Sequence, residues 1–252
     1  MHSNREVKPM KEPLSSASFE SRERLSPRLR EHASRIAEGV ERIAPPHRES
    51  GETFARWIAE HYRPGSPLHA VVVCTGNSRR SILGSSMGNL AASFYGMPEL
   101  RFYSGGTEPS AFNPRTVRAL QAAGFAVEPT GEENSPGNPI YRVSWGEGFE
   151  TLEFSKHYSD ASNPQKGFAA LMVCNEADAG CPMVRGASVR IPMPFEDPKE
   201  FDDQAVEPEM YAERRDEIGK VMFSVMERVQ ELRAGEVMLS MMARMSAEKE
   251  SR

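Results

Sequence analysis

The sequence predicts an α/β protein: a parallel four-stranded sheet with helices on both faces, preceded by a helical extension and interrupted by a β-hairpin insertion. The sheet is predicted because short apolar runs alternate with helical stretches from residue 69 onward, the pattern of strand-helix-strand units with right-handed crossovers. The insertion is predicted because this alternation breaks between about residues 128 and 166. The extension is predicted because a helical stripe of apolar residues precedes the first strand.

Residues 1–65 are expected to form the N-terminal extension. Its first twenty residues are polar and rich in Ser, Glu and Lys, and we expect them to be disordered. Apolar residues recur at helical spacing across residues 25–43, and the sequence APPH ends this helix. A second short helix is predicted over residues 54–62, with RPGSP at residues 63–67 as a linker.

The main domain is expected over residues 66–235. Its clearest helix has Asn113 as the N-cap, Pro114 at the first helical position and Gly124 just past the end. In an open parallel sheet, ligands bind at the carboxyl ends of the strands. The predicted strands are Ala70–Cys74, Leu100–Ser104, Phe168–Cys174 and Ala187–Ile191, and the predicted helices are Ser81–Tyr95, Asn113–Ala123 and Glu207–Leu232.

An insertion of about residues 129–166 interrupts the main domain. Its segment PIYRVSWGEGFETLEFS has the pattern of two strands joined by a Gly-rich turn. Its aromatic residues either pack at the edge of a sheet, with no further role, or contact a second subunit or a reductase partner. These residues are Trp145, Phe149 and Phe154.

Residues 236–252 form a Met-rich tail. Its methionines recur at helical spacing, which indicates a helix that docks its apolar face or frays; binding of copper or of a partner helix is the alternative. The methionines are Met238, Met241, Met242 and Met245.

The charge, the apolar stretches and the cysteine count of the sequence limit its possible partners and its location in the cell. The net charge of -5 and the lack of a long basic stripe argue against nucleic acid. No apolar stretch is long enough to span a membrane and the N-terminus has no secretory pattern, so we expect a cytoplasmic protein. Three cysteines do not make a disulfide framework, so in a reducing compartment they are free thiols, metal ligands or redox groups.

The segment VVVCTGNSRRS (residues 71–81) carries the chemistry. A strand delivers Cys74 to a short loop, and backbone amides and the N-terminus of the following helix converge on a point where an oxyanion can bind. The same field stabilises the Cys74 thiolate, to which Ser81 can donate a hydrogen bond, while Arg80 can clamp an oxyanion. From the residues alone, Cys74 could instead be a small buried hydrophobe. The oxyanion-binding loop is Thr75, Gly76, Asn77, Ser78, Arg79 and Arg80.

The sequence CTGNSRRS resembles the phosphate loop of the low-molecular-weight protein tyrosine phosphatase superfamily, and above all that of its thioredoxin-coupled arsenate reductases. Further segments resemble that superfamily in the same order: SGGTEPSAFNPRTVRALQAAGF at 104–125, VCNEADAGCPMV at 173–184 and FEDP at 195–198. The resemblance covers about Leu68 to Leu232 without the insertion.

The reductase resemblance implies a relay of three thiols. Cys74 attacks arsenate, Cys174 attacks Cys74 and expels arsenite, and Cys181 attacks Cys174. Thioredoxin then reduces the Cys174–Cys181 disulfide, and no cofactor is bound. The resemblance to the phosphatases implies a different use of the site, in which Cys74 attacks phosphorus and Asp197 protonates the leaving group and then activates water.

Other readings of these residues stay open. Cys174 could be a buried core thiol, Cys181 an idle loop residue, and the whole chain a non-catalytic oxyanion-binding or interaction module. We expect no zinc or other metal site, because six residues between two cysteines is not a usual ligand spacing and His157 is isolated.

Three departures from the superfamily pattern bear on function. Arg79 replaces a residue that is commonly cysteine, and we expect it to point to solvent at the rim of the pocket. Ser85 replaces a glutamate that helps to bind a stabilising cation, so we expect no specific potassium site, although Asn77 and Ser104 remain. Lys199 and Glu200 stand where phosphatases have a tyrosine after the Asp-Pro pair, which weakens the phosphotyrosine reading.

Overall fold

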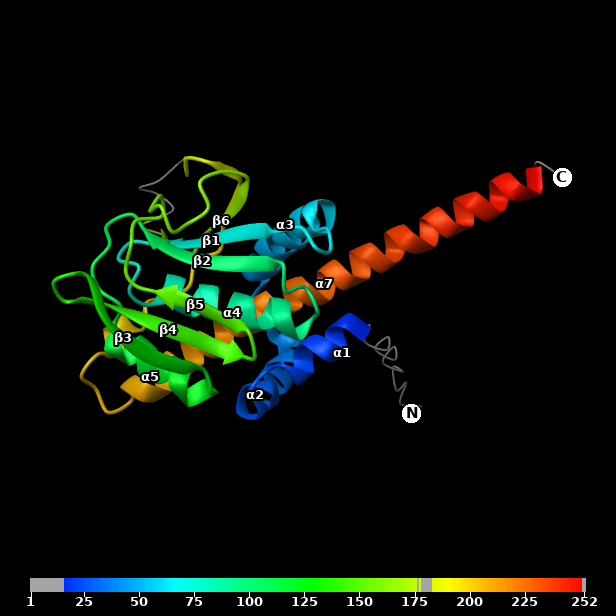
Figure 1. Ribbon diagram of the computed structural model, residues 1–252. Coiled ribbons are helices and arrows are strands. Elements are labelled where there is room, and N and C mark those ends of the chain that lie inside the picture. The colour runs from blue at the N-terminus through cyan, green and yellow to red at the C-terminus, as the bar shows by residue number, and fades with distance from the viewer. Residues whose placement is uncertain (1–15, 176, 178–182, 251–252) are drawn as a thin grey trace, which may run out of the picture.

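The computed structural model describes residues 16–175, 177 and 183–250. Its central sheet has four strands in the order β2-β1-β6-β7, and all three pairings are parallel, which confirms the predicted sheet (Figure 1). Because the strands run in one direction, their carboxyl ends, Cys74 among them, lie along one edge. The strands are β1 (Leu68–Cys74), β2 (Leu100–Gly106), β6 (Phe168–Met172) and β7 (Ala187–Pro192).

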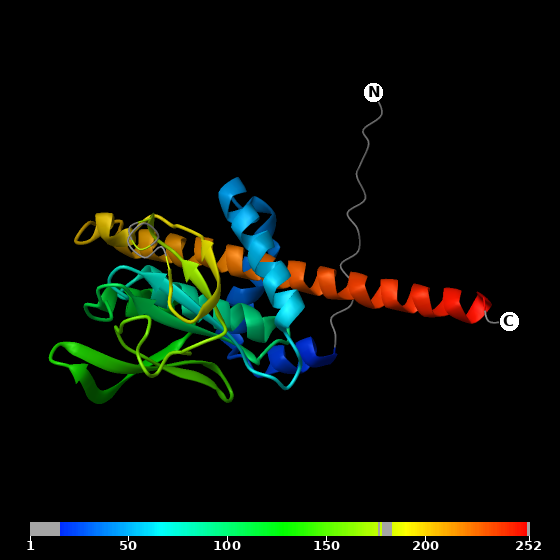
Figure 2. The same cartoon turned by 90° about the horizontal axis from the view of Figure 1, so that it is seen from above.

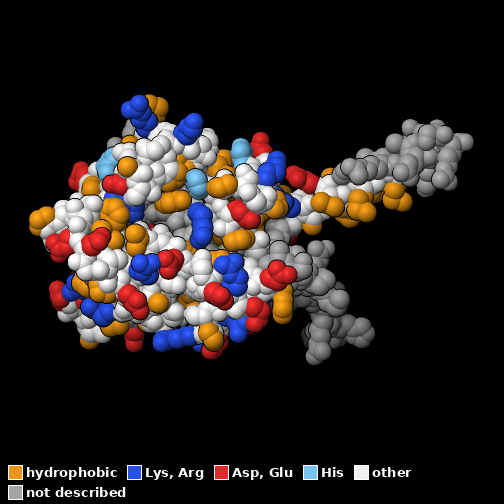
Figure 3. All heavy atoms as spheres, viewed as in Figure 1, with side chains coloured by type: hydrophobic (Ala, Val, Ile, Leu, Met, Phe, Trp, Pro, Cys, Tyr) orange, Lys and Arg blue, Asp and Glu red, His pale blue; other side chains and the backbone are white. Residues whose placement is uncertain are grey.

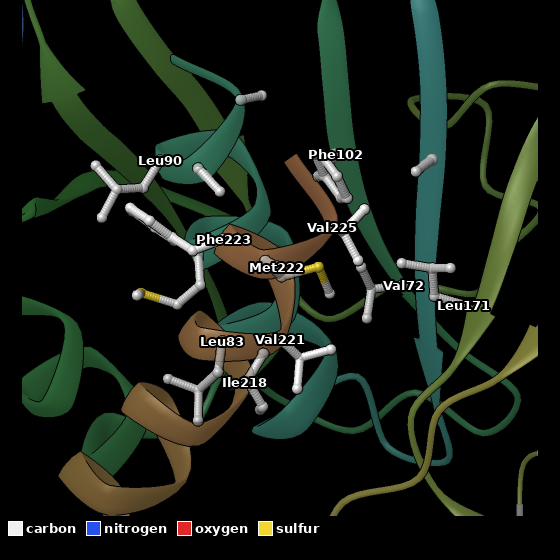
Figure 4. Packing of buried hydrophobic residues seen from close by; sticks show 14 of the residues in the cluster. Val72, Leu83, Leu90, Phe102, Leu171, Ile218, Val221, Met222, Phe223 and Val225 are labelled. Carbon is white, nitrogen blue, oxygen red and sulfur yellow. The ribbon is translucent and has the colours of Figure 1, made fainter. Parts of the chain in front are cut away.

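Helices cover one face of this sheet. On α4 (Arg80–Phe94), Gly88 lies against Phe102 of β2, and a Cβ there would be 2.5 Å from the ring, so glycine permits the close approach. Phe54 of α3 (Pro45–His61) packs edge-on against the same ring. Figures 2 and 4 show α7 (Glu207–Glu250) running beside α4, with its apolar side chains directed into the core.

On the opposite face, Tyr158 lies against Gly105 of β2. A Cβ on Gly105 would approach the Tyr158 Cα to 2.5 Å, so the glycine is required by this contact. Helix α5 (Pro114–Ala123) has the predicted boundaries: the Asn113 side chain accepts a hydrogen bond from Arg115 N, and Gly124 is left-handed with φ of 115°. The capping signals in the sequence therefore placed this helix correctly.

The N-terminal extension is more helical than predicted. We expected disorder through residue 20, but residues 16–20 belong to α1 (Ser16–Glu23); residues 1–15 lie outside the described part. The physical reason is docking on the end of α4, where Ser18 Oγ donates to Tyr95 O at 2.9 Å and Arg22 Nε donates to Phe94 O at 2.7 Å.

The two predicted helices of the extension are present with different bounds. The first becomes α2 (Pro27–Glu38), which ends at its C-cap Gly39 rather than at APPH, followed by the 3₁₀ turn η1 (Val40–Arg42); the prolines of APPH lie instead at the start of the next helix. The second, α3, starts at Pro45 rather than near residue 54, because prolines at the first helical positions also open a helix. Buried residues of α2 and α3 belong to the same hydrophobic cluster as those of the parallel sheet.

The insertion is a three-stranded antiparallel sheet rather than a two-stranded hairpin. The predicted strands are β4 (Asn138–Gly146) and β5 (Phe149–Glu153), and β3 (Ala126–Ser135) adds a third along β4. Trp145 is buried and its Nε1 donates to Ser93 Oγ of α4 at 2.9 Å. Phe149 is buried too. Neither Trp145 nor Phe149 is therefore exposed to a second subunit or a reductase, and the prediction that they could form such a contact is wrong.

Helix α7 does not end at Leu232 but continues through the Met-rich tail to Glu250. Its methionines Met238, Met241, Met242 and Met245 are each about 60% exposed, so this part of the helix does not dock on the described residues. Figure 3 shows the hydrophobic side chains along the projecting end. No helix in the described part of the chain is both long enough and apolar enough to cross a membrane.

Candidate active site

The predicted oxyanion loop joins the centre of the parallel sheet to the N-terminus of α4. Asn77 lies in it with φ of 42°, one of two described non-glycine residues with positive φ, and asparagine tolerates this region better than most residues. The loop is held from outside: Gly76 O accepts hydrogen bonds from Ser110 N at 3.0 Å and from Ser155 Oγ at 3.0 Å, and Ser78 Oγ donates to Ala111 O. These contacts fix the backbone before any ligand binds.

Cys74 and Ser81 are in direct contact inside this loop. The distance from Cys74 Sγ to Ser81 Oγ is 3.1 Å, and both residues are buried. Asn77 Nδ2 donates to Ser81 Oγ from 2.8 Å, so the oxygen of Ser81 already accepts a hydrogen bond. The hydroxyl hydrogen of Ser81 is therefore available to Cys74, and a serine aimed in this way stabilises a thiolate.

Arg80 and Asp197 also meet at this edge. Arg80 Nη2 lies 2.7 Å from Asp197 Oδ2, and Arg80 Nη1 donates to Phe195 O at 3.0 Å. Asp197 precedes the 3₁₀ turn η2 (Pro198–Phe201), whose first N–H groups it caps through Lys199 N. The predicted clamp and the predicted general acid are thus brought together across more than a hundred residues of sequence.

A cavity of about 150 Å³ opens beside this pair. Its lining is polar and includes both the guanidinium and the carboxylate described above. The lining residues are Arg80, Asn175, Pro194, Phe195, Glu196, Asp197 and Glu200. Such a hollow has room for a small oxyanion rather than for a large organic ligand.

Cys174 lies on the neighbouring part of the same edge. Strand β6 pairs with β1 so that Met172 is opposite Val73, and Val173 N donates to Val73 O at 2.9 Å. Cys174 therefore follows β6 just as the loop follows β1, and its Sγ lies 3.5 Å from Thr75 Oγ1. The Cys174 side chain is fully buried. Cys181, the third predicted thiol, lies outside the described residues.

Arg79 does not point to solvent, which corrects the sequence expectation. Its Nε donates to Tyr211 Oη at 2.7 Å and its Nη2 to Asp202 Oδ2 at 2.7 Å, and its side chain is 16% exposed. Although burial alone lowers the pKa of Arg79, the hydrogen bond with Tyr211 and the charge of Asp202 raise it overall. Burial and the hydrogen bond to Asp202 raise the pKa of Tyr211 above its usual range. Arg79 thus ties the loop to α7.

Sequence reasoning missed a buried ion pair behind the loop. Glu153 and Lys156 have side chains only 2% and 3% exposed, and Lys156 Nζ lies 3.4 Å from Glu153 Oε2. Lys156 N donates to Asn77 Oδ1 at 2.8 Å, so this pair is connected to the loop. Both residues stand near the end of the insertion, and no motif marks them; the one available signal was two opposite charges three residues apart beside a strand.

Among the described residues, which leave out Cys181, no group of three or more His, Cys, Asp and Glu side chains is arranged to hold a metal ion. His157 contacts Ser159 Oγ through Nδ1 at 2.8 Å and its ring lies against that of Tyr158, so it has local partners.

No protein-family model and no curated protein matches this chain. Similar solved structures include a low-molecular-weight phosphotyrosine phosphatase from Vibrio cholerae O395, which is 14% identical with a TM-score of 0.43 over 66% of this chain and 98% of that one. They also include an arsenate reductase from Archaeoglobus fulgidus DSM 4304, at 15% identity and a TM-score of 0.36 over 61% of this chain and 98% of that one.

A thioredoxin-dependent arsenate reductase from Corynebacterium glutamicum is similar over a longer part of the chain. It is 16% identical with a TM-score of 0.34, and the alignment covers 89% of this chain and 85% of that one. The neighbours thus include both phosphatases and arsenate reductases.

Proposed function

We propose that this chain is an arsenate reductase that uses a three-cysteine disulfide relay, with thioredoxin as the electron donor. The observation that carries the proposal is the position of Cys174, whose Sγ lies 3.5 Å from the hydroxyl of Thr75, the loop residue next to Cys74. A hydrolase needs one thiol at such a loop. A reductase needs a second thiol there, because the adduct on the first thiol must be resolved by a neighbouring sulfur.

In the first step the Cys74 thiolate attacks the arsenic of arsenate, an As–S bond forms, and a hydroxyl group of the arsenate takes up a proton from solvent and leaves as water. Ser81 stabilises the attacking thiolate through its hydroxyl, at 3.1 Å from the sulfur. The loop amides and Arg80 hold the remaining oxygens, as amides at a helix N-terminus and a guanidinium do for tetrahedral anions.

In the second step the Cys174 thiolate attacks Cys74 Sγ. The S–S bond forms, the S–As bond breaks and its electron pair stays on arsenic, which leaves as arsenite. Cys181 then attacks Cys174 Sγ and releases the Cys74 thiolate, and the dithiol of thioredoxin reduces the resulting disulfide. The roles of Cys181 and thioredoxin are proposed from the resemblance of VCNEADAGCPMV to the redox segment of the reductases.

The alternative is a phosphatase that hydrolyses phosphomonoesters through a phosphocysteine intermediate. The contact between Asp197 and Arg80 favours it, because it keeps a carboxyl group at the loop where a leaving oxygen needs a proton. Lys199 and Glu200 after Asp197-Pro198 weaken it for phosphotyrosine, since they supply no aromatic wall. A non-catalytic oxyanion-binding module is the third possibility.

The test measures both activities on the same proteins. Arsenate-dependent NADPH oxidation with thioredoxin and thioredoxin reductase is followed beside p-nitrophenyl phosphate hydrolysis, for wild type, Cys74→Ser and Cys174→Ser. We expect arsenate turnover in the wild type and none in either variant. Full turnover by Cys174→Ser would rule out the relay, and hydrolysis without arsenate turnover would establish the phosphatase.

Cys181→Ser provides the matched control within the relay. Without thioredoxin it should release one arsenite per chain and then stop with Cys74 and Cys174 joined, which non-reducing peptide mass spectrometry detects. Cys174→Ser should release none under the same conditions. Binding of phosphate with neither activity would favour the binding module.

A further inference from the structure

Lys156 occupies an unusual position for a lysine, because its ammonium group is buried behind the oxyanion loop. Its side chain is 3% exposed and its Nζ lies 3.4 Å from Glu153 Oε2 and 4.6 Å from the centre of the Phe154 ring. A buried ion pair is often no more stabilising than apolar side chains of the same size, so stability alone gives little reason for this one. Its neighbours supply a better reason.

Glu153 connects the pair to β2 and α4. Its Oε2 accepts a hydrogen bond from Ser104 Oγ at 2.7 Å, and its Oε1 lies 3.4 Å from Ser85 Oγ, whose hydrogen is shared with Ile82 O at 3.1 Å. Ser85 lies one turn after Ser81 on α4, so both serines lie on the same face of this helix. The carboxylate thereby holds the face that carries Ser81.

Lys156 connects the pair to the loop itself. Its backbone N donates to Asn77 Oδ1 at 2.8 Å, and its carbonyl oxygen accepts from Gly106 N at 2.9 Å. Asn77 in turn donates from Nδ2 to Ser81 Oγ, which contacts Cys74 Sγ. A continuous path of hydrogen bonds therefore runs from the backbone of Lys156 through Asn77 and Ser81 to the sulfur, and the orientation of the Asn77 amide is fixed at both ends.

We infer that Lys156 is a positioning residue for the nucleophile: its ammonium group is the fixed internal counter-ion of Glu153, and the neutral pair holds Asn77 and Ser81 so that the Ser81 hydroxyl points at Cys74. The inference rests on Cys74 being the nucleophile of the proposed function, but not on arsenate being the substrate. Without the ammonium group, the buried carboxylate has no compensating charge and only the hydroxyls of Ser104 and Ser85 remain as its hydrogen-bond donors, so these serines and the face of α4 must shift toward it. The aim of Ser81 is then lost.

The readout is alkylation of Cys74 by iodoacetamide as a function of pH, followed on the Cys74 peptide by mass spectrometry so that the other thiols do not interfere. Among the described residues, the charged and titratable groups in contact with the loop are Arg80 with its partner Asp197, and Cys174 beside Thr75, and all of them stay unchanged. Lys156→Met should slow alkylation at neutral pH by about tenfold, the loss expected when one hydrogen bond to a charged acceptor is removed, and displace the rate profile to higher pH.

The double variant Glu153→Gln/Lys156→Met shows whether Lys156 acts as the counter-ion of Glu153 or only fills space in the structure. It removes both charges while the glutamine side chain can still accept from Ser104, so we expect alkylation close to the wild-type rate. The exposed Lys166→Met, in the same insertion, is the control and should leave the profile unchanged.

Each outcome decides the inference. Slow alkylation in Lys156→Met with recovery in the double variant supports it, and so does a single variant that fails to fold beside a double variant that folds and reacts normally. An unchanged profile in Lys156→Met, or a double variant that stays slow or unfolded, overturns it. Because the assay contains no arsenate, a wild type that shows Lys156-dependent alkylation without arsenate turnover would refute the proposed function and leave this inference standing.

Discussion

Arg80 donates a hydrogen bond to Asp197 across 2.7 Å, so the guanidinium that is placed to clamp an oxyanion is bound to a carboxylate of this same chain. An arriving anion must share or displace this partner, and its negative charge then lies beside that of Asp197. The pair is partly shielded from solvent, with side chains 11% and 30% exposed, so the repulsion between the two anions is incompletely screened.

Asp197→Asn should therefore bind phosphate more tightly than the wild type, by about three- to tenfold, the range that about 1 kcal/mol of an incompletely screened charge interaction gives. Isothermal titration calorimetry with inorganic phosphate measures this directly. Glu60→Gln, which removes an exposed carboxylate from α3, is the control for net charge and should change little. Weaker phosphate binding by Asp197→Asn would mean that Asp197 supports the anion site rather than competing for Arg80.

Arg79→Ala should lower stability and leave anion attraction unchanged. The substitution leaves Tyr211 and Asp202 without their shared partner in a largely buried position, which costs about 1–3 kcal/mol. Urea denaturation measures the loss. Arg118→Ala, which removes an arginine that is 61% exposed and pairs with Glu207, is the comparison and should cost less. If the urea midpoint of Arg79→Ala is unchanged and phosphate binds more weakly at low salt, Arg79 acts at the rim of the pocket as the sequence predicted, and not as a structural tie.

The central strands β1 and β6 could be predicted because they are buried on both faces and so read as continuous apolar runs, as VVVC does. The helix α5 could be predicted because its caps are local signals. Strand β3 could not be predicted, because its sequence AVEPTGEENS is polar, contains Pro129 and is mostly exposed. It forms a strand only because β4 offers it backbone hydrogen-bond partners.

Part of the candidate site could likewise be predicted from the sequence, and part could not. The loop, Cys74, Ser81 and Arg80 are contiguous in sequence, and a strand followed by a helix fixes their arrangement. The orientation of Arg79 depends on Asp202 and Tyr211, which are more than a hundred residues away, and sequence patterns carry no information on such pairs. The same holds for Lys156, since a lysine between polar residues gives no sign that it is buried.

Asp216 should make the docking of the N-terminal extension sensitive to acid. His32 Nε2 of α2 lies 3.1 Å from Asp216 Oδ1 of α7. Burial alone raises the pKa of Asp216, but the adjacent His32 ring and the hydrogen bond from Arg215 hold it below its usual value of 3.8 overall. A carboxyl whose pKa is lower in the folded state stabilises the protein above the unfolded-state pKa, and this contribution is lost as the pH falls through the folded-state pKa.

Asp216→Asn should therefore be less stable than the wild type at neutral pH, and the difference should shrink as the pH falls below about 4, where the carboxyl of the unfolded wild type becomes protonated. Urea denaturation of both proteins between about pH 2 and 7 measures the difference. Asp203→Asn, at an 89% exposed position, is the control and should follow the wild type more closely. A constant difference between Asp216→Asn and wild type at every pH would show that the charge of Asp216 contributes nothing.

Removal of residues 236–252 should leave the stability of the body of the protein unchanged. The last described contacts of α7 with the body include Arg233 Nη1, which donates to Tyr62 O at 2.9 Å, whereas Met238, Met241, Met242 and Met245 are each about 60% exposed. An isolated helix of this length is marginal in water and adds no apolar burial to the core. We expect the same melting temperature and the same rate of Cys74 alkylation for a chain that ends at Gly235. Arg233→Ala in the full chain is the matched comparison, because it removes the last anchor and should lower the melting temperature more than the truncation does. A truncated chain that melts several degrees lower would mean that the methionine face is covered in solution.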